Sequence, residues 1–514
     1  MQRDGARQSL WQTVMPVYRT RYETITDNRY DVLIIGGGIT GLTTALELQK
    51  AGMRCILIEA FNIGFGTTGG TTAHLNTLME TPYYQVESDF SEGAAKLLAK
   101  ATKRAINLVK SNVDQYNIDC SFAQLPAYLY SEDEKQTQGL TKILDSFNKA
   151  GLDASWVNEI PLPVAFDKAA VFQHQAQIHP TRYIYGLAKA FEDLGGILLQ
   201  NCRAGEMENQ DGMHRVNTNL GNINARNVVY ATHIPLHINL LHFRCAPYRS
   251  YAMAVKLQDG NYPEALVYDM RDPYYYYRTQ IVDGNMYLVA GGEDHKTGHE
   301  ENTEICFRNL QAHLRKHFKI EEISFKWSAQ YYEPADGLPY IGKLPGFDSN
   351  VFVATGFGGN GITYGSVSGF VLADLITKSD SEYKDLFNPN RVKPVAGFTN
   401  FVKENADVVK EFVKGRLAKE KINSFAEIAT GEAKVVKMDG DSIAVYKDEN
   451  GELHAVSPVC NHAKCIVAWN TAEKSWDCPC HGARYNADGE VITAPAHSHL
   501  TSYELYEDDE NNEA

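Results

Sequence analysis

The sequence is poor in basic side chains and contains no long apolar run. Lysine and arginine number 49 against 64 aspartates and glutamates, which leaves a net charge of −15 over 514 residues. Nucleic acids and anionic membranes both require a basic surface, so we expect neither as a partner. A membrane-spanning helix needs about 20 apolar residues. The best candidate, 351–376, is interrupted by glycines, so we expect no membrane span.

An apolar segment is also missing from the first residues, MQRDGARQSLWQ. We therefore expect no secretory signal and predict a cytoplasmic protein. Of nine cysteines, five are scattered between 55 and 306, and four lie at 460, 465, 478 and 480. Crowded cysteines in a cytoplasmic chain indicate a metal site before structural disulfides.

A βαβ unit is expected near the start of the chain. Apolar strands are predicted at 32–35 and 54–59, and an amphipathic helix at about 39–51. A turn of three consecutive glycines joins the first strand to the helix. This order predicts an α/β domain of the Rossmann type.

The glycine turn predicts a dinucleotide site. Gly36, Gly38 and Gly41 fit the pattern G-x-G-x-x-G. The three glycines permit a tight turn, close approach of backbone N–H groups to a pyrophosphate, and close packing of the helix on the strand. Glu59 ends the second strand, eighteen residues after Gly41, where it would accept hydrogen bonds from a ribose.

A second match to the same pattern, GFGGNG, occurs at 356–361 between a predicted strand at 351–355 and a helix that extends to about 376. No acidic residue ends a strand after it, because Asp374 falls within the helix. We therefore expect no second nucleotide domain.

Other predicted elements lie between these motifs. Long helices are expected at 92–117 and 182–194, and a buried strand at 227–232. The segment 245–330 is rich in aromatic, strand-like runs and predicts an antiparallel sheet. Residues 1–29 are expected to form an N-terminal arm.

Three stretches carry a resemblance to the amino-acid-oxidase-like FAD oxidoreductases: NVVYAT at 227–232, EPADGLPYIG at 333–342 and ATGFGGNGIT at 354–363. The resemblance covers 30–380. It implies an FAD-binding domain of the Rossmann type (30–85, 178–240 and 330–380) with an inserted α+β substrate domain (86–177 and 241–329).

The same resemblance implies FAD-contacting residues beyond the first glycine motif. GFGTTGGTTAH at 64–74 resembles the loop beside the cofactor, and some relatives attach flavin covalently near this loop. Those attachment positions fall near Gly70, so we interpret His74 as a packed or hydrogen-bonded loop residue. The implied contacts are Thr67, Thr68, Gly356, Gly358, Gly361, Ile362 and Thr363.

A mixed set of cysteines and histidines indicates a metal centre near the C-terminus. Cys460 and His462 are followed, after 15 residues, by Cys478 and His481. Two thiolates and two imidazoles suit a [2Fe–2S] cluster with a potential of roughly −150 to +300 mV. They are also a zinc set, although zinc fingers usually pair Cys with Cys and His with His.

The flanks, WDCPCHGARY and GEVITAPAHSHL, resemble Rieske [2Fe–2S] domains and favour the cluster. The resemblance covers a small all-β domain at 423–505, after a linker at 381–422 and before an acidic tail at 506–514. It implies a disulfide between Cys465 and Cys480. Ala483 stands where high-potential members have serine, whereas Tyr485 matches them. Loss of one hydroxyl donor predicts a potential in the lower or middle part of the range.

As a whole, the chain resembles the bacterial Rieske-domain-containing FAD-dependent oxidoreductases. This implies an enzyme that oxidises an amine or amino acid at the flavin and passes single electrons through the cluster to an external acceptor protein. Arg278 is a candidate partner for a substrate carboxylate. Tyr251 and Tyr276 are candidates for the cavity lining. No residue is identified as an acid or base.

Alternatives remain at this point. They are a reductase whose electrons enter through the cluster, an FAD oxidase that uses O₂, and a redox-sensing protein. An oxygenase would need a mononuclear iron site, and the acids and histidines of 293–299 do not have the spacing of one. We interpret 293–299 as a surface turn.

Overall fold

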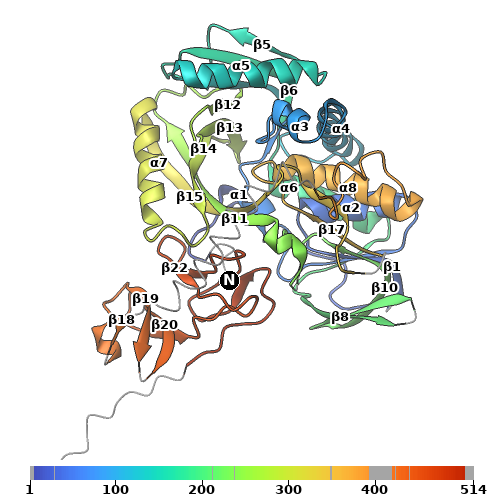
Figure 1. Ribbon diagram of the computed structural model, residues 1–514, viewed down its shortest axis with the longest axis vertical. Coiled ribbons are helices and arrows are strands. Elements are labelled where there is room, and N and C mark those ends of the chain that lie inside the picture. Colours follow the sequence, from blue (N-terminus) through green and yellow to red (C-terminus); the bar gives the residue numbers. More distant parts are fainter. Residues whose placement is uncertain are drawn as a thin grey trace, which may run out of the picture.

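Four β-sheets form the framework of the computed structural model (Figure 1). The structure describes residues 5–27, 29–210, 212–236, 238–347, 350–392, 420–422, 424–438 and 440–503. Most of the predicted linker and the whole acidic tail lie outside the described residues. No helix in the described part of the chain is long and apolar enough to cross a membrane.

The first sheet is of the Rossmann type, with the order β16-β17-β10-β1-β2-β7. β1 pairs in parallel with β2 and β10, and β16 adds an antiparallel edge. β2 and β17 are buried along their full length, as is typical of parallel strands covered on both faces. The bounds are β1 Arg29–Ile35, β2 Cys55–Ile58, β7 Ile197–Leu199, β10 Gly221–Tyr230, β16 Tyr340–Lys343 and β17 Val351–Thr355, with a hairpin of β8 Ala204–Gln210 and β9 Met213–Thr218 on β10.

Three helices pack on the face of this sheet that carries Val32 and Ile34, namely α2 Ile39–Lys50, α6 Pro180–Asp193 and α8 Gly361–Lys378. A further helix, α4 Glu92–Tyr116, packs on α6 and α8. The predicted βαβ unit, the helix at 92–117 and the strand at 351–355 are confirmed. α6 begins two residues earlier than predicted, because Pro180 occupies its first turn and the side chain of His179 caps it.

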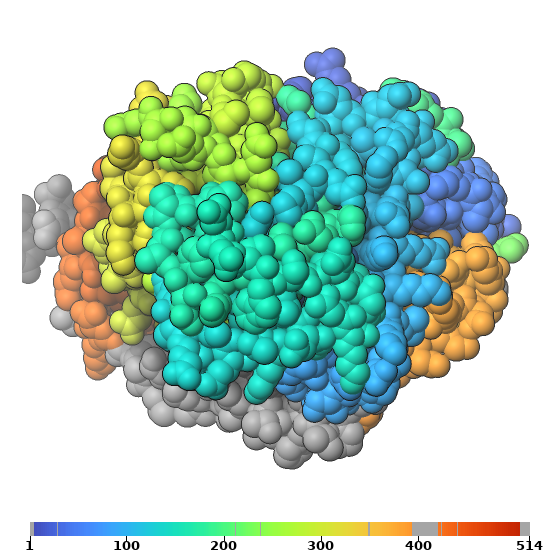
Figure 2. Space-filling model, turned by 90° about the horizontal axis from the view of Figure 1, so that it is seen from above, coloured from blue at the N-terminus to red at the C-terminus, as the bar shows by residue number. Residues whose placement is uncertain are grey.

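The second sheet has nine strands and forms the inserted domain. The antiparallel sheet predicted at 245–330 is present, but 304–317 is a helix, and strands from 123–177 complete the same sheet. The strands are β3 His74–Leu75, β4 Ala123–Ser131, β5 Ala154–Val157, β6 Lys168–Gln177, β11 Cys245–Leu257, β12 Leu266–Asp269, β13 Tyr276–Val282, β14 Asn285–Lys296 and β15 Ile320–Pro334. The helices are α3 Tyr83–Asp89, α5 Glu134–Lys149 and α7 Glu304–His317. Seen from above, the teal segment with α5 covers the near face of the molecule (Figure 2).

The C-terminal domain contains two four-stranded sheets and lies beside β11 and β15 (Figure 1). Together with the first two sheets, it gives the predicted fold class. One sheet consists of β18 Glu420–Lys421, β19 Ala433–Met438, β20 Asp441–Lys447 and β21 Leu453–Val456. The other consists of β22 Ala468–Asn470, β23 Ser475–Asp477, β24 Arg484–Tyr485 and β25 Val491–Thr493.

The N-terminal arm is anchored in the core by a short helix, α1 (Leu10–Thr13). Trp11 is fully buried, and its indole N–H donates to the Thr71 carbonyl over 2.6 Å. The Ser9 hydroxyl donates to the carbonyl of Gly69. The arm thus fixes the loop that contains the 3₁₀ helix η1 (Thr67–Gly70).

Replacing Trp11 with alanine removes a buried indole and its hydrogen bond. We expect W11A to lower the free energy of unfolding by about 3 to 5 kcal/mol. Trp156 is 43% exposed on β5, so W156A is the matched control, with an expected change within about 0.5 kcal/mol. Denaturant unfolding of both variants checks this; equal effects would show that Trp11 is not an anchor.

Candidate functional site

A cavity of about 290 Å³ lies where the two large sheets and the C-terminal domain meet. Its lining includes the glycine turn after β1, the end of β2, η1, and tyrosines of the second sheet. The C-terminal domain contributes Ile492, Thr493 and Ala494. The cavity is therefore completed by a domain distant in sequence.

One end of the cavity has the geometry of a dinucleotide site. Gly36 has φ +116°, and a Cβ at Gly41 would lie 1.9 Å from the Gly36 carbonyl oxygen, so only glycine fits at these two positions. Gly38 is the N-cap of α2. Glu59 accepts from the Gly37 N–H over 2.7 Å, and burial raises the pKa of its carboxyl group.

The second glycine motif and η1 reach the same cavity. The Thr68 hydroxyl accepts from the Ile39 N–H over 3.1 Å, and Thr67 lies 3.2 Å from His233 Nδ1. Gly358, Gly361 and Ile362 line the cavity with Thr67 and Thr68, as the resemblance implies.

Three predicted contacts do not line the cavity. Gly41 packs α2 on the turn. Gly356 lies against Cys245 and Pro334, and the Thr363 hydroxyl donates to the Asn76 carbonyl. These three residues pack against the elements that form the cavity and do not contact the cavity themselves.

The donor set fits FAD. Backbone N–H groups at the start of α2 suit a pyrophosphate, and Glu59 suits a ribose. The start of α8 opens on the same cavity, where its partial positive charge suits an electron-rich ring. Gly36, Gly38, Glu59, Thr67, Thr68 and Gly358 would hold the cofactor.

Aromatic side chains surround the other end of the cavity. The cavity lining here consists of Tyr268, Tyr274, Tyr276 and His74. The centroids of neighbouring rings in this group lie 5.2 to 6.4 Å apart. The Tyr268 hydroxyl lies 2.8 Å from His74 Nδ1, in agreement with a hydrogen-bonded role for His74. Burial lowers the pKa of His74 well below its usual range, so its imidazole is neutral.

Two carboxylates lie among these rings. Glu80 accepts from the Tyr274 hydroxyl over 2.8 Å and from the Gly359 N–H over 2.6 Å. Asp294 accepts from the Tyr331 hydroxyl over 2.9 Å. Both line the cavity, and burial raises the pKa of each.

Asp294 corrects the interpretation of 293–299 as a surface turn. Residues through Lys296 belong to β14, and Asp294 lies at the cavity. The strand was not predicted because its sequence is charged and rich in glycine. A register shift opposite β11 also interrupts the alternation of its side chains between the two faces of the sheet.

The structure does not place the candidates Arg278 and Tyr251 in the cavity. Arg278 is fully buried behind it and donates to the Ala73 and Ile178 carbonyls and to Gln280. Its hydrogen bonds therefore go to the protein itself, and it does not line the cavity. Tyr251 is buried on the far side, 2.9 Å from His295.

The four predicted metal ligands lie together in two loops of the C-terminal domain. Cys460 and Cys478 are buried free thiols in contact, and a hydrogen bond from Cys478 lowers the pKa of Cys460. The rings of His462 and His481 are 5.0 Å apart. Burial lowers the pKa of His481 to about 3, and neither of its buried ring nitrogens has a hydrogen-bond partner among the described residues. Two thiols and neutral imidazoles fit a Rieske cluster.

Neighbouring groups support these loops. A disulfide joins Cys465 to Cys480, as the resemblance implies, and so ties the two loops together. The Tyr485 hydroxyl lies 3.2 Å from Cys460 Sγ. Ala483 is fully buried and offers no hydroxyl group.

The histidines face the first domain. The ring of His242, in η2 (Leu240–Phe243), lies 4.5 Å from that of His462 and 5.7 Å from that of His481. Phe243 contacts His481 at 5.6 Å. The imidazole edge of the centre is therefore covered by η2.

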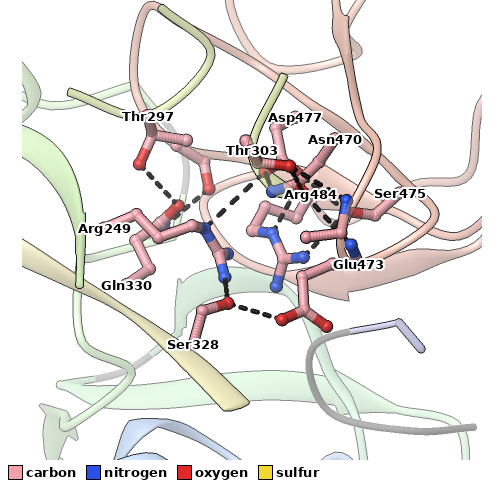
Figure 3. A network of polar contacts seen from close by, with 12 residues as sticks. Arg249, Thr297, Thr303, Ser328, Gln330, Asn470, Glu473, Ser475, Asp477 and Arg484 are labelled. Atoms are coloured by element: carbon pink, nitrogen blue, oxygen red, sulfur yellow. Dashed lines mark hydrogen bonds and ion pairs between the residues drawn. The ribbon is translucent and has the colours of Figure 1, made fainter. Parts of the chain in front are cut away.

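A buried polar network joins the C-terminal domain to the second sheet (Figure 3). Arg249 pairs with Asp477 at 3.9 Å and donates to the Ser328 hydroxyl. Ser328 in turn donates to Glu473 over 2.6 Å, and Arg484 pairs with Asp477 at 2.8 Å. The four charged residues are at most 2% exposed, and their formal charges balance.

Two residues of β15 connect the cavity to the metal loops. Gln330 lines the cavity and donates to the Gly482 carbonyl over 2.9 Å. The Tyr332 hydroxyl donates to the His481 carbonyl over 3.1 Å. A short hydrogen-bonded path thus runs from the cavity to a predicted ligand.

Sequence reasoning missed the functional residues Glu80, Asp294, Gln330 and Tyr332. The alternation in the run of four tyrosines was one available signal, because Tyr274 and Tyr276 line the cavity while Tyr275 stacks on His313.

Comparisons with known proteins agree with this architecture. Residues 31–375 match the family model described as FAD dependent oxidoreductase, and 419–504 match the Rieske [2Fe-2S] domain. The chain is 34% identical to the putative Rieske 2Fe-2S iron-sulfur protein YhfW of Bacillus subtilis (strain 168), over 93% of this chain and 94% of that protein.

Two further similarities concern the region before the C-terminal domain. Gamma-glutamylputrescine oxidoreductase of Escherichia coli (strain K12) is 25% identical over 72% of this chain and 88% of its own length. The crystal structure of glycine oxidase from Geobacillus kaustophilus superposes with a TM-score of 0.61 at 20% identity, over 71% of this chain and all of that chain, and shows the shared fold.

The hydroxyl of Tyr485 tests the cluster site. A donor to a ligand sulfur stabilises the more negative reduced cluster, so Y485F is expected to lower the potential. One hydrogen bond of about 1 kcal/mol corresponds to about 40 mV for one electron. A483S, which restores a hydroxyl, is expected to raise the potential by a similar amount.

Redox titration followed by EPR measures both shifts. Tyr446, which stacks on Trp469, gives the control Y446F, for which we expect no shift. An unchanged potential in Y485F would refute the proposed sulfur contact.

Proposed function

Because the chain belongs to the FAD dependent oxidoreductase family and carries a Rieske [2Fe–2S] domain, we propose that it oxidises an amine or amino acid and exports the electrons singly through the cluster to an external acceptor. Its cofactors are FAD and the [2Fe–2S] cluster. FAD supplies two-electron oxidation of a C–N bond, and the cluster supplies one-electron transfer.

The residues of this chain have three tasks in such a reaction. The start of α2 and Glu59 hold the dinucleotide. Tyrosines of the second sheet exclude water from the other end of the cavity and orient the substrate. The residues Cys460, His462, Cys478 and His481, which remain predicted ligands, hold the cluster beside this cavity.

One observation carries the proposal: Gln330 and Tyr332 link the cavity to the cluster loop by hydrogen bonds of 2.9 and 3.1 Å. A cofactor in the cavity and a cluster on His481 would thereby be joined within one buried interface. This arrangement supports internal electron transfer over an isolated cluster with a separate role.

The test is anaerobic mixing of the holoenzyme with amines, N-methyl amino acids or NAD(P)H. We expect an amine or amino acid to bleach the flavin absorption and the reduced-cluster EPR signal to follow. Bleaching with the cluster left oxidised would favour an oxidase, with peroxide formed in air. Reduction by NAD(P)H alone would refute amine oxidation and favour a flavin that accepts hydride from a nicotinamide. No reduction by any compound would favour redox sensing or the reductase whose electrons enter through the cluster.

The hydrogen bond between Tyr332 and the cluster loop leads to a second prediction. Y332F removes the hydrogen bond to the His481 carbonyl, so we expect slower cluster reduction while the bleaching rate is unchanged. Tyr287 packs on Phe325 away from the cavity and supplies the control Y287F. Rapid-freeze EPR measures cluster reduction; equal rates in both variants would remove Tyr332 from the path.

A further inference from the structure

The aromatic end of the cavity combines negative charge with exposed ring faces. Glu80 and Asp294 lie among Tyr268, Tyr274 and Tyr276. Aromatic faces attract cations, and buried carboxylates require a positive partner. This lining is complementary to a cation.

The Asp294 carboxylate lines the cavity, and one of its oxygens has no hydrogen-bond partner among the described residues. Oδ2 accepts from Tyr331, and Ser250 donates to the carboxylate from β11. Oδ1 is shielded from solvent and has no hydrogen-bond partner among the described residues. Glu80, by contrast, is held by Tyr274 and Gly359. Asp294 is therefore the carboxylate available for a direct contact.

Three arginines near the cavity, in the described part of the chain, are engaged elsewhere. Arg278 lies behind the lining and is bound to three acceptors. Arg203 lies over Phe61 at the dinucleotide end. Arg484 is paired with Asp477 within the interface between domains. Among the described residues that line this end of the cavity, a substrate carboxylate would meet two acids and no arginine or lysine.

We propose that the substrate is a cationic primary or secondary amine without a carboxylate on the carbon that bears its nitrogen, and that the Asp294 carboxylate accepts a hydrogen bond from its ammonium group. This rests on the proposed function and narrows its substrate class from amines and amino acids to amines. The tyrosines contact the ammonium and the adjacent carbons, and Glu80 adds negative potential.

A pair of probes separates binding from oxidation. tert-Butylamine and 2-aminoisobutyrate both lack hydrogen on the carbon bearing nitrogen, so neither can be oxidised to an imine. They differ by one methyl group replaced with a carboxylate. Calorimetric titration of the holoenzyme should give at least tenfold tighter binding of tert-butylamine. Equal or tighter binding of 2-aminoisobutyrate would overturn the proposal.

Variants assign the effect to Asp294. D294N should weaken binding of tert-butylamine by about tenfold or more, because a charge-assisted hydrogen bond becomes a neutral one. D283N is the control, since Asp283 pairs with Arg182 over 2.8 Å and does not line the cavity. Unchanged affinity in a folded, FAD-loaded D294N would contradict the role of Asp294. If D294N does not fold, the wild-type comparison of the two probes still decides the substrate class.

Affinity should also depend on pH. Burial raises the pKa of Asp294 to about 7. The ionisable groups that face it are Tyr331 of β15, Tyr274 and Tyr276 beside β13, Glu80 before α3 and Glu293 on its own strand. The carboxylate is protonated below this pKa, so tert-butylamine should bind more tightly as pH rises from 6 to 8. In D294N this rise should be smaller; an equal rise would contradict the assignment.

Failure of this proposal and failure of the proposed function are distinguishable. Butylamine and norvaline are the oxidisable counterparts, related by the same added carboxylate. Anaerobic bleaching by norvaline with preferred binding of 2-aminoisobutyrate would retain the dehydrogenase and refute the cationic site. Absence of bleaching by every amine and amino acid would refute the dehydrogenase and, with it, the assignment of a substrate.

Discussion

The buried ion pair between Arg249 and Asp477 is the contact on which the arrangement of the domains depends. Removing Asp477 would take a buried carboxylate from both Arg249 and Arg484, which costs several kcal/mol. Arg484 and Glu473 balance the remaining charge of the group. The two domains are therefore complementary at this surface, and neither presents a surface suited to water.

This contact determines the composition of the cavity. Because the C-terminal domain is held against β15, its residues line the space that the glycine motifs prepare for FAD. The same docking places η2 on the imidazole rings of the metal loops. The FAD site and the cluster site consequently share one interface, although the second glycine motif ends at Gly361 and the cluster motif begins only at Cys460.

Local motifs were accessible to prediction, and contacts between distant segments were not. Gly36, Gly41 and Glu59 act within one βαβ unit, so their spacing carries their role. Cys460 and Cys478 are similarly confined to two loops. The positions of Asp294 and Gln330 in the site depend on which face of their strand meets the cavity. A register shift between β14 and β11 changes that face for Asp294. The burial of Trp11 could not be predicted from the polar arm, because the carbonyl that its indole contacts lies 60 residues away in the loop of η1.

The contribution of Ile492, Thr493 and Ala494 to the FAD cavity couples the maturation of the two prosthetic groups. A group that binds only the docked arrangement stabilises it by mass action, so occupancy of either site favours the conformation that the other site requires. Assembly of the holoenzyme is then cooperative. A chain that has acquired its iron and sulfide retains its flavin more firmly, and one starved of iron releases it more readily.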